Sequence, residues 1–253
     1  MNHPAFARID HRPWPLPAKR WTWRQTWRDL LFMHWPLPAS LLRPLVPRPL
    51  EVQEFDGSAW IGIVPFHMEG VTRRGVPAFP GISAFPELNV RTYVSLQGKP
   101  GVWFFSLDAA NRLAVWTARR YFHLPYFHAA MSIHSSGPGF AYQSRRLPQK
   151  DHPVLFLGSY RPISSSYEAK PGSLDHWLTA RYCLYARSAA GNLYRTEVHH
   201  APWPLQHAEA EITVNSMLDP HGLKIPPSPP VLHFARSLEV AVWPPERLRV
   251  GKA

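Results

Sequence analysis

Short runs of apolar, aromatic and β-branched residues, bounded by Gly, Pro, Asn and Asp, recur along most of this chain. Such runs are typical of β-strands rather than of long helices. Turn residues at 56–57 and 189–192 predict hairpins. The predicted strands cover residues 51–55, 59–68, 87–97, 102–108, 130–134, 140–146, 154–160, 182–187, 193–199, 209–215 and 238–243, and the aromatic segment 21–35 also favours extended structure.

Helical patterns are confined to short segments. The best covers 111–122, where Asn111 or Asp108 is a candidate N-cap and basic residues lie near the C-terminal end. Shorter helices are predicted over 40–46 and 173–179, and Pro residues keep the first of them brief.

The connections between these elements contain no evident repeat or domain boundary. Residues 1–18 predict an irregular, Pro-rich arm, 71–86 a long Pro- and Gly-rich loop, and 225–230 an extended connector. The 29 Pro residues argue against long helices throughout. We therefore expect residues 1–253 to form a single domain of the mainly β (α+β) class with few short helices.

The segment 87–97 carries one apolar and one polar face. Strand side chains alternate between faces, so the even positions from Leu88 to Leu96 form the packed side. Two interpretations remain open: a solvent-facing sheet with a surface ion pair, or the polar wall of a cavity that holds a small molecule. The lack of Lys on the polar face and the aromatic partner strand 102–108 favour the cavity. The polar face presents Glu87, Asn89, Arg91 and Tyr93 in succession.

Turn chemistry at 98–101 predicts the register of this hairpin. A four-residue loop there places Tyr93 opposite Ser106. It also places Arg91 opposite Asp108. Opposed side chains on one face lie about 4.5–5.5 Å apart at Cβ. The register therefore predicts a hydrogen bond in the first pair and an ion pair in the second.

Composition narrows the class of protein. With 45% hydrophobic and 13% aromatic residues in a length of 253, the chain is expected to fold. Its 28 Lys and Arg against 17 Asp and Glu give a net charge of +11, which suggests polyanionic partners first. The basic residues, 22 Arg and 6 Lys, are scattered singly or in pairs without a recognition motif, so nucleic acid is the less favoured partner.

The single Cys and the hydropathy pattern bear on the compartment. Cys183 alone excludes an intramolecular disulfide and a Cys-based zinc site, and its apolar surroundings predict a buried, unreactive thiol. No apolar run predicts a signal peptide, and none approaches the roughly 18 residues of a membrane span. A cytoplasmic protein without a membrane partner is therefore expected.

Local motifs of catalysis and cofactor binding do not stand out. There is no Gly-x-Ser-x-Gly elbow and no phosphate or dinucleotide loop, so no cofactor is expected. Adjacent His199 and His200 point to opposite faces of a predicted strand, so they cannot share a metal ion, and no metal site is predicted. One of the two is expected to face the same cavity as Glu87.

Lysine chemistry has no good candidate. A Schiff-base Lys needs an apolar pocket or a cationic neighbour that lowers its pKa. The Lys residues of this chain lie instead in turns, loops or terminal segments: Lys19, Lys99, Lys150, Lys170, Lys224 and Lys252.

Several long motifs resemble those of a known family. They include FPELNVRTYV, GKPGVWFFSLDA, an AR…LPY segment, PGSL…RYCLYA and HHAPWPLQ. From about Trp21 to Trp243 the chain resembles the YqjF-like family of uncharacterised bacterial proteins, a domain of unknown function. That family is similar to the acetoacetate decarboxylase-like fold, and the resemblance implies an antiparallel, cone-shaped β-barrel with extra strands.

The resemblance also implies roles for individual residues. Glu87 matches a strand-borne Glu of the decarboxylases, and Arg119 and Pro125 match a later Arg and Pro. Tyr126 and Phe127 stand where the decarboxylases have two Lys, the first of which forms the Schiff base. Because Tyr cannot form an imine, lysine-dependent decarboxylation is not implied.

The leading hypothesis is a small-molecule-binding β-barrel and, if it is an enzyme, one that acts on a carbonyl or carboxylate compound by lyase- or hydrolase-like acid–base chemistry without a Schiff-base Lys. A ligand sensor without turnover and basic-surface binding to nucleic acid are the alternatives, and a homo-oligomer is compatible with each. Glu87 and Tyr126 are the candidate catalytic residues, since burial would raise the pKa of Glu87 and suit it to acid–base chemistry. The candidate ligand-binding residues are Asn89, Arg91, Tyr93, Ser106, Arg119 and His200.

Overall fold

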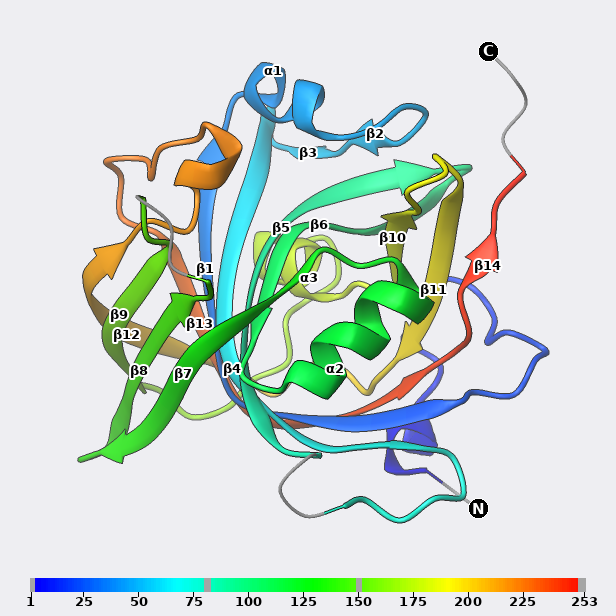
Figure 1. Ribbon diagram of the computed structural model, residues 1–253, viewed down its shortest axis with the longest axis horizontal. Coiled ribbons are helices and arrows are strands. Elements are labelled where there is room, and N and C mark those ends of the chain that lie inside the picture. Colours follow the sequence, from blue (N-terminus) through cyan, green and yellow to red (C-terminus); the bar gives the residue numbers. More distant parts are fainter. Residues whose placement is uncertain (1–2, 80–82, 149–151, 250–253) are drawn as a thin grey trace.

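The computed structural model describes residues 3–79, 83–148 and 152–249. Within these ranges the chain forms a 14-stranded sheet with short helices between the strands (Figure 1). None of these helices is long and apolar enough to cross a membrane. The strands are β1 (Trp23–Leu37), β2 (Glu51–Val52), β3 (Glu54–Phe55), β4 (Ser58–Arg73), β5 (Phe85–Leu96), β6 (Lys99–Ala109), β7 (Tyr126–Ser136), β8 (Gly139–Arg146), β9 (Leu155–Pro162), β10 (Cys183–Arg187), β11 (Leu193–His199), β12 (Leu205–Asn215), β13 (Val231–Val242) and β14 (Glu246–Arg247). The α-helices are α1 (Ala39–Leu42), α2 (Arg112–Thr117) and α3 (Leu174–Thr179).

Strand pairings close the sheet into two rings that share one wall. The wall is the run of neighbours β13, β1, β4, β5 and β6. The pair β10 and β11 connects β6 back to β13 and closes the first ring. The run β7, β8, β9 and β12 makes the same connection and closes the second ring. The mainly β fold with few short helices is confirmed, although β6 pairs in parallel with β7 and with β10, where the prediction was antiparallel.

Alternation along β5 divides its side chains between two environments. Leu88 and Val90 are fully buried in a large hydrophobic cluster that includes Tyr142, Phe156 and Phe234 of β8, β9 and β13. The odd positions of β5 face the first ring, where polar groups collect. The wall therefore has a core face, which packs, and a polar face, which lines a cavity.

The turn between β5 and β6 differs from the prediction. Gln97 and Gly98 form a two-residue turn in which both have positive φ, 53° and 73°, so Leu96 pairs with Lys99. The predicted four-residue loop at 98–101 is wrong, because β6 has already begun at Lys99.

A β-bulge farther along this hairpin exchanges the faces to which the last side chains of β6 point. Arg91 pairs with Phe104, but Val90 pairs with Ser106, so Phe105 is the extra residue on β6. An odd shift of register exchanges the two faces for every side chain beyond it. The residues of β6 after Phe105 therefore face opposite to the way that the sequence predicted.

Both predicted cross-strand contacts are wrong, because the shorter turn moves the partners of Tyr93 and Arg91 by four residues and the bulge then turns Ser106 and Asp108 to the core face. Arg91 and Asp108 lie on opposite faces of the wall, and Asp108 forms a buried ion pair with Arg146 of β8, 2.7 Å between Oδ1 and Nη2. Tyr93 pairs nearer the turn than Ser106 does, so their hydroxyl groups do not meet.

The predicted helices are confirmed. A π-helical turn, Ala118–Phe122, extends α2 to the end of the predicted segment 111–122, and the Asn111 side chain accepts a hydrogen bond at its start. Ser173 caps α3 in the same way. The predicted loop 71–86 is shorter than expected, because β4 continues to Arg73 and β5 begins at Phe85, and its residues 80–82 lie outside the described residues.

Candidate functional site

A cavity of about 350 Å³ lies inside the first ring, with lining residues from β1, β4, β5, β6, β10, β11 and β13. This volume is within the usual range of small-molecule sites, about 300–1,000 Å³. Most of the lining is apolar. Its polar residues include Glu87, Asn89 and Arg91 from the polar face of β5, Tyr126 from the start of β7, and Arg181.

Glu87 and Tyr126 form a hydrogen-bonded pair on the cavity wall. The Tyr126 hydroxyl donates to Oε2 of Glu87 at 2.7 Å, and no described residue hydrogen-bonds to Oε1. Glu87 is 3% exposed. Burial raises its pKa from 4.5 to about 8, with the Tyr126 hydrogen bond acting against this shift and Asp108 adding to it. The carboxyl group is therefore mostly protonated at neutral pH and has a proton to donate.

Two buried guanidinium groups also line the cavity. Arg91 and Arg181 are 8% and 7% exposed, and their hydrogen-bond acceptors among the described residues are uncharged. Arg91 contacts the Tyr93 hydroxyl at 3.4 Å, whereas Arg181 donates to the Trp177 carbonyl and the Gln53 side chain. Burial lowers the pKa of Arg181 to about 10, and the charge of Arg91 contributes to the shift. This part of the cavity therefore holds positive charge without an acidic partner.

Unpaired polar atoms mark the same region. Nε of Arg91, Nη2 of Arg181 and Oδ1 of Asn89 are buried without a hydrogen-bond partner. Buried polar groups are normally paired, so these three atoms are available to hydrogen-bond a molecule in the cavity. Sequence reasoning did not select Arg181. Its burial could have been inferred from the sequence, because Arg181 directly precedes the apolar run Tyr182–Tyr185.

The structure brings some predicted site residues together and separates others. Glu87, Asn89, Arg91, Tyr126 and His200 all line the cavity. The remaining three, Tyr93, Ser106 and Arg119, do not line it.

Each of these three has a different place. Tyr93 lies behind the lining, with its hydroxyl 2.6 Å from Nε2 of His34. Ser106 lies beyond the bulge on the core face of β6. Arg119 lines a separate groove on the other side of α2.

His200 contributes a ring to the wall, with each ring nitrogen near a backbone carbonyl oxygen, and in its neutral form it donates to one of the two. Its Nδ1 is 2.7 Å from the Ala201 carbonyl oxygen, and its Nε2 is 3.3 Å from that of Arg181. Burial lowers its pKa to about 4, so the ring is neutral. His199 points to the opposite face, where Phe6 stacks on it.

The described residues are not arranged to support metal, thiol or lysine chemistry. No group of three or more His, Cys, Asp or Glu among them is placed to hold a metal ion. Cys183 lines the cavity, but burial raises its pKa to about 12, so it is a thiol. The described lining contains no Lys. Lys150 and Lys252 lie outside the described residues.

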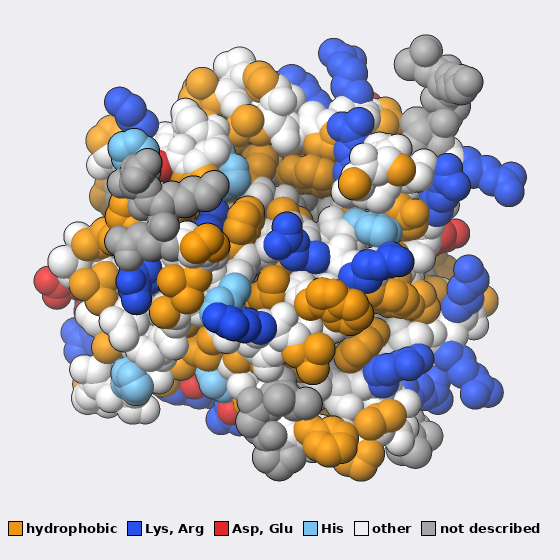
Figure 2. Space-filling model, viewed as in Figure 1, with side chains coloured by type: hydrophobic (Ala, Val, Ile, Leu, Met, Phe, Trp, Pro, Cys, Tyr) orange, Lys and Arg blue, Asp and Glu red, His pale blue; other side chains and the backbone are white. Residues whose placement is uncertain are grey.

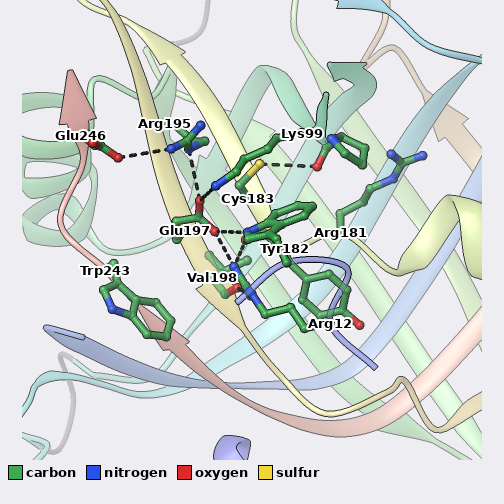
Figure 3. A network of polar contacts seen from close by, with 12 residues as sticks. Arg12, Lys99, Arg181, Tyr182, Cys183, Arg195, Glu197, Val198, Trp243 and Glu246 are labelled. Carbon is green, nitrogen blue, oxygen red and sulfur yellow. Dashed lines mark hydrogen bonds and ion pairs between the residues drawn. The ribbon is translucent and has the colours of Figure 1, made fainter. Parts of the chain in front are cut away.

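The N-terminal arm is fastened to β11 beside the cavity (Figure 3). Glu197 is the anchor, because Arg12 and Trp14 of the arm both bond to its Oε2. Lys99 and Arg195 contact Oε1 of the same carboxylate at 3.3 and 3.1 Å. The arm, predicted to be irregular, is thus held by a buried ionic cluster.

Comparisons with known proteins agree with the sequence resemblance. The pattern of the DUF2071 family, described as an uncharacterized conserved protein, matches residues 24–239. The uncharacterized protein YqjF of Bacillus subtilis (strain 168) is 49% identical over 229 residues, which cover 90% of this chain and 93% of that protein.

Solved structures show the same fold at low sequence identity. Acetoacetate decarboxylase from Legionella pneumophila superposes with a TM-score of 0.62 at 13% identity, covering 95% of this chain and 93% of that one. The enduracididine biosynthesis enzyme MppR, complexed with the condensation product of pyruvate and imidazole 4-carboxaldehyde, gives 0.62 at 12%, covering 89% and 88%. An acetoacetate decarboxylase-like enzyme from Sphingomonas wittichii RW1 gives 0.62 at 12%, covering 96% and 99%. The chain therefore belongs to the DUF2071 family of uncharacterized conserved proteins and has the acetoacetate decarboxylase-like fold.

Proposed function

We propose that this protein is an enzyme that binds a carbonyl-bearing carboxylic acid in the cavity of the first ring and acts on it by acid–base chemistry. The observation that carries this proposal is the combination of two groups on one cavity. Arg91 and Arg181 supply buried positive charge without an acidic partner, and Glu87 supplies a buried, protonated carboxyl group.

The guanidinium groups support a carboxylate as the anionic part of the ligand. A buried charge without a partner is costly, and a bound anion removes this cost. Guanidinium and carboxylate match in geometry, since two parallel N–H groups donate to two oxygens. The unpaired Nε of Arg91 and Nη2 of Arg181 are donors of this kind.

The Glu87–Tyr126 pair supports a carbonyl as the reacting part. Because Tyr126 donates to Oε2, the acidic proton of Glu87 is assigned to Oε1, which has no described partner. A carboxylic acid held neutral in this way donates a hydrogen bond or a proton to a carbonyl oxygen. Burial and Glu87 together raise the pKa of Tyr126 well above its usual value, so the phenol remains a donor. The solved complex of MppR with pyruvate supports the same ligand class.

Arg91→Gln tests the anion site. We expect the affinity for 2-oxohexanoate to fall by a factor of about 10–100, because charge-assisted hydrogen bonds are lost. Thermal shift and calorimetric titration measure the loss, with Arg119→Gln as the matched control outside the cavity. Equal affinities of wild type and Arg91→Gln would refute the anion site. Proton NMR of the mixture reports turnover, and an acid that binds but stays unchanged would leave ligand sensing as the function.

Borohydride treatment tests the mechanism. Because the described lining has no Lys, we expect no reduced adduct on the protein after incubation with acetoacetate or 2-oxohexanoate. Intact-mass spectrometry detects such an adduct. A covalent adduct on any Lys would replace the acid–base proposal with an imine mechanism.

A further inference from the structure

We infer that the ligand of this cavity is amphipathic, with its carboxylate at the buried end and an apolar chain or ring that extends to an open mouth. This inference rests on the proposed function and adds the substrate class. It follows from the order in which polar and apolar groups occur along the cavity.

Strand register gives this order. Along β5 the lining residues run from Arg91 through Asn89 and Glu87 to Phe85. At about 3.3 Å per residue, this run spans roughly 20 Å. The neighbouring strand β4 continues past Phe85 to Arg73, which pairs with Trp23 at the start of β1 and also lines the cavity.

The lining residues of β5 are all buried, and large exposed lining residues occur only beyond Phe85. Arg91, Glu87 and Phe85 are 8%, 3% and 6% exposed. Beyond them the lining includes Phe79 and Leu113, which are 63% and 55% exposed. The cavity is therefore closed at the guanidinium end and open where β4 ends, with Glu87 between.

Most of the lining between Glu87 and the mouth is apolar, and Nε1 of Trp27 is a buried polar atom without a hydrogen-bond partner there. Phe66 lies beside Glu87 on β4, and Met68 lies beside Phe85. Trp27 and Leu30 of β1 line the same cavity. Apolar walls bind apolar ligand groups, at about 25 cal/mol for each Å² removed from water. A ligand group in this stretch is therefore mainly hydrocarbon.

Exposed hydrophobic residues at the mouth indicate that the apolar part reaches the surface. Val76, Phe79 and Leu113 are large apolar side chains that line the opening and contact water. On the face that carries α2, hydrophobic and basic side chains are interspersed and acidic ones are few (Figure 2). A hydrocarbon chain leaving the cavity would cover these three side chains.

The volume also favours a ligand larger than a three-carbon acid. The six non-hydrogen atoms of pyruvate, at no more than the roughly 30 Å³ share of a liquid water each, fill at most about 180 Å³. The cavity measures about 350 Å³. The remainder leaves room for several methylene groups.

The orientation is fixed by desolvation. Arg24 and Arg73 also line the mouth, but they face water, where a guanidinium needs no bound anion. Arg91 and Arg181 are desolvated and gain more from one. The carboxylate is therefore assigned to the buried end.

A homologous series of straight-chain 2-oxo acids, from three to eighteen carbons, tests the inference by calorimetric titration of the wild-type protein. We expect Kd to fall up to about fourfold with each added methylene until the chain reaches the mouth. Phe79→Ser and Leu113→Ser, at exposed positions, should weaken the longest acids several-fold and leave the Kd of the short acids unchanged. Arg91→Gln should weaken every member, and Arg24→Gln should not.

The outcomes separate this inference from the proposed function. Binding that does not improve with chain length, or improvement that both mouth substitutions leave unchanged, would overturn the amphipathic ligand while the carboxylate site stands. Failure of every acid in the series to bind would overturn the proposed function itself.

Discussion

Glu87→Gln is expected to stabilise the folded protein above neutral pH and to flatten its stability between about pH 4.5 and pH 8. The folded-state pKa of Glu87 is raised above its unfolded value of 4.5 to about 8. Its protonated form therefore favours folding fully below pH 4.5, and this contribution is lost as the pH rises towards 8. The resulting penalty at high pH is on the order of 5 kcal/mol, from about 1.4 kcal/mol for each pKa unit. Gln keeps the shape and the acceptor for Tyr126 without ionising.

Urea unfolding of both proteins across pH 4–9.5 measures this difference. Tyr126→Phe is the matched comparison, since it removes the hydrogen bond that lowers the pKa of Glu87 and should move the decline in stability to higher pH. The exposed substitution Glu209→Gln should leave the pH profile unchanged. If the stability of Glu87→Gln depends on pH in the same way as that of the wild type, Glu87 is ionised in the folded protein at neutral pH.

Glu197→Ala is expected to lower the free energy of unfolding by about 3–5 kcal/mol, the range found when a buried ion pair loses one partner. Its carboxylate is 9% exposed and bonds to the Arg12 side chain, which is 1% exposed. Lys99 and Arg195 contact the same carboxylate, so the substitution leaves Arg12 and Lys99 without an acid, whereas Arg195 keeps its pair with Glu246. The unpaired Arg12 accounts for the largest part of this loss, because water cannot solvate its buried guanidinium.

Chemical denaturation and limited proteolysis test this prediction together. The matched control is Glu209→Ala, which breaks the exposed pair with Arg161, where both side chains are more than half exposed, and should cost less than about 1 kcal/mol. We also expect cleavage of the arm in Glu197→Ala, because Arg12 and Trp14 lose their anchor. Unchanged stability, with an arm that resists protease, would show that the cluster does not hold the arm.

The sequence predicted the fold class and much of the candidate site through alternation. Side chains alternate between the two faces along β5, so Glu87, Asn89 and Arg91 share one face, and nothing within the strand interrupts this alternation. The helix at 111–122 followed from its cap for the same reason, since a cap is a local signal.

Features that depend on the partner strand were not predictable in this way. The bulge at Phe105 is a property of two strands together, and its odd shift places Asp108 on the core face with Arg146. The Gln97–Gly98 turn lacks the Asn or Asp that usually marks two positive φ values. Arg181 reaches the cavity only through the pairing of β10 with β6, which is parallel and distant in sequence.

The pairing of β1 with β13 has a consequence for biosynthesis. Thr26 and Glu239 hydrogen-bond across this pair although they are 213 positions apart, so one edge of β1 stays unpaired until β13 has left the ribosome. The wall then lacks one of its strands, neither ring is closed, and the ligand cavity does not yet exist. A nascent chain of this protein exposes the unpaired backbone N–H and C=O groups along this edge of β1 during most of its synthesis, so β1 is the segment that most needs a chaperone.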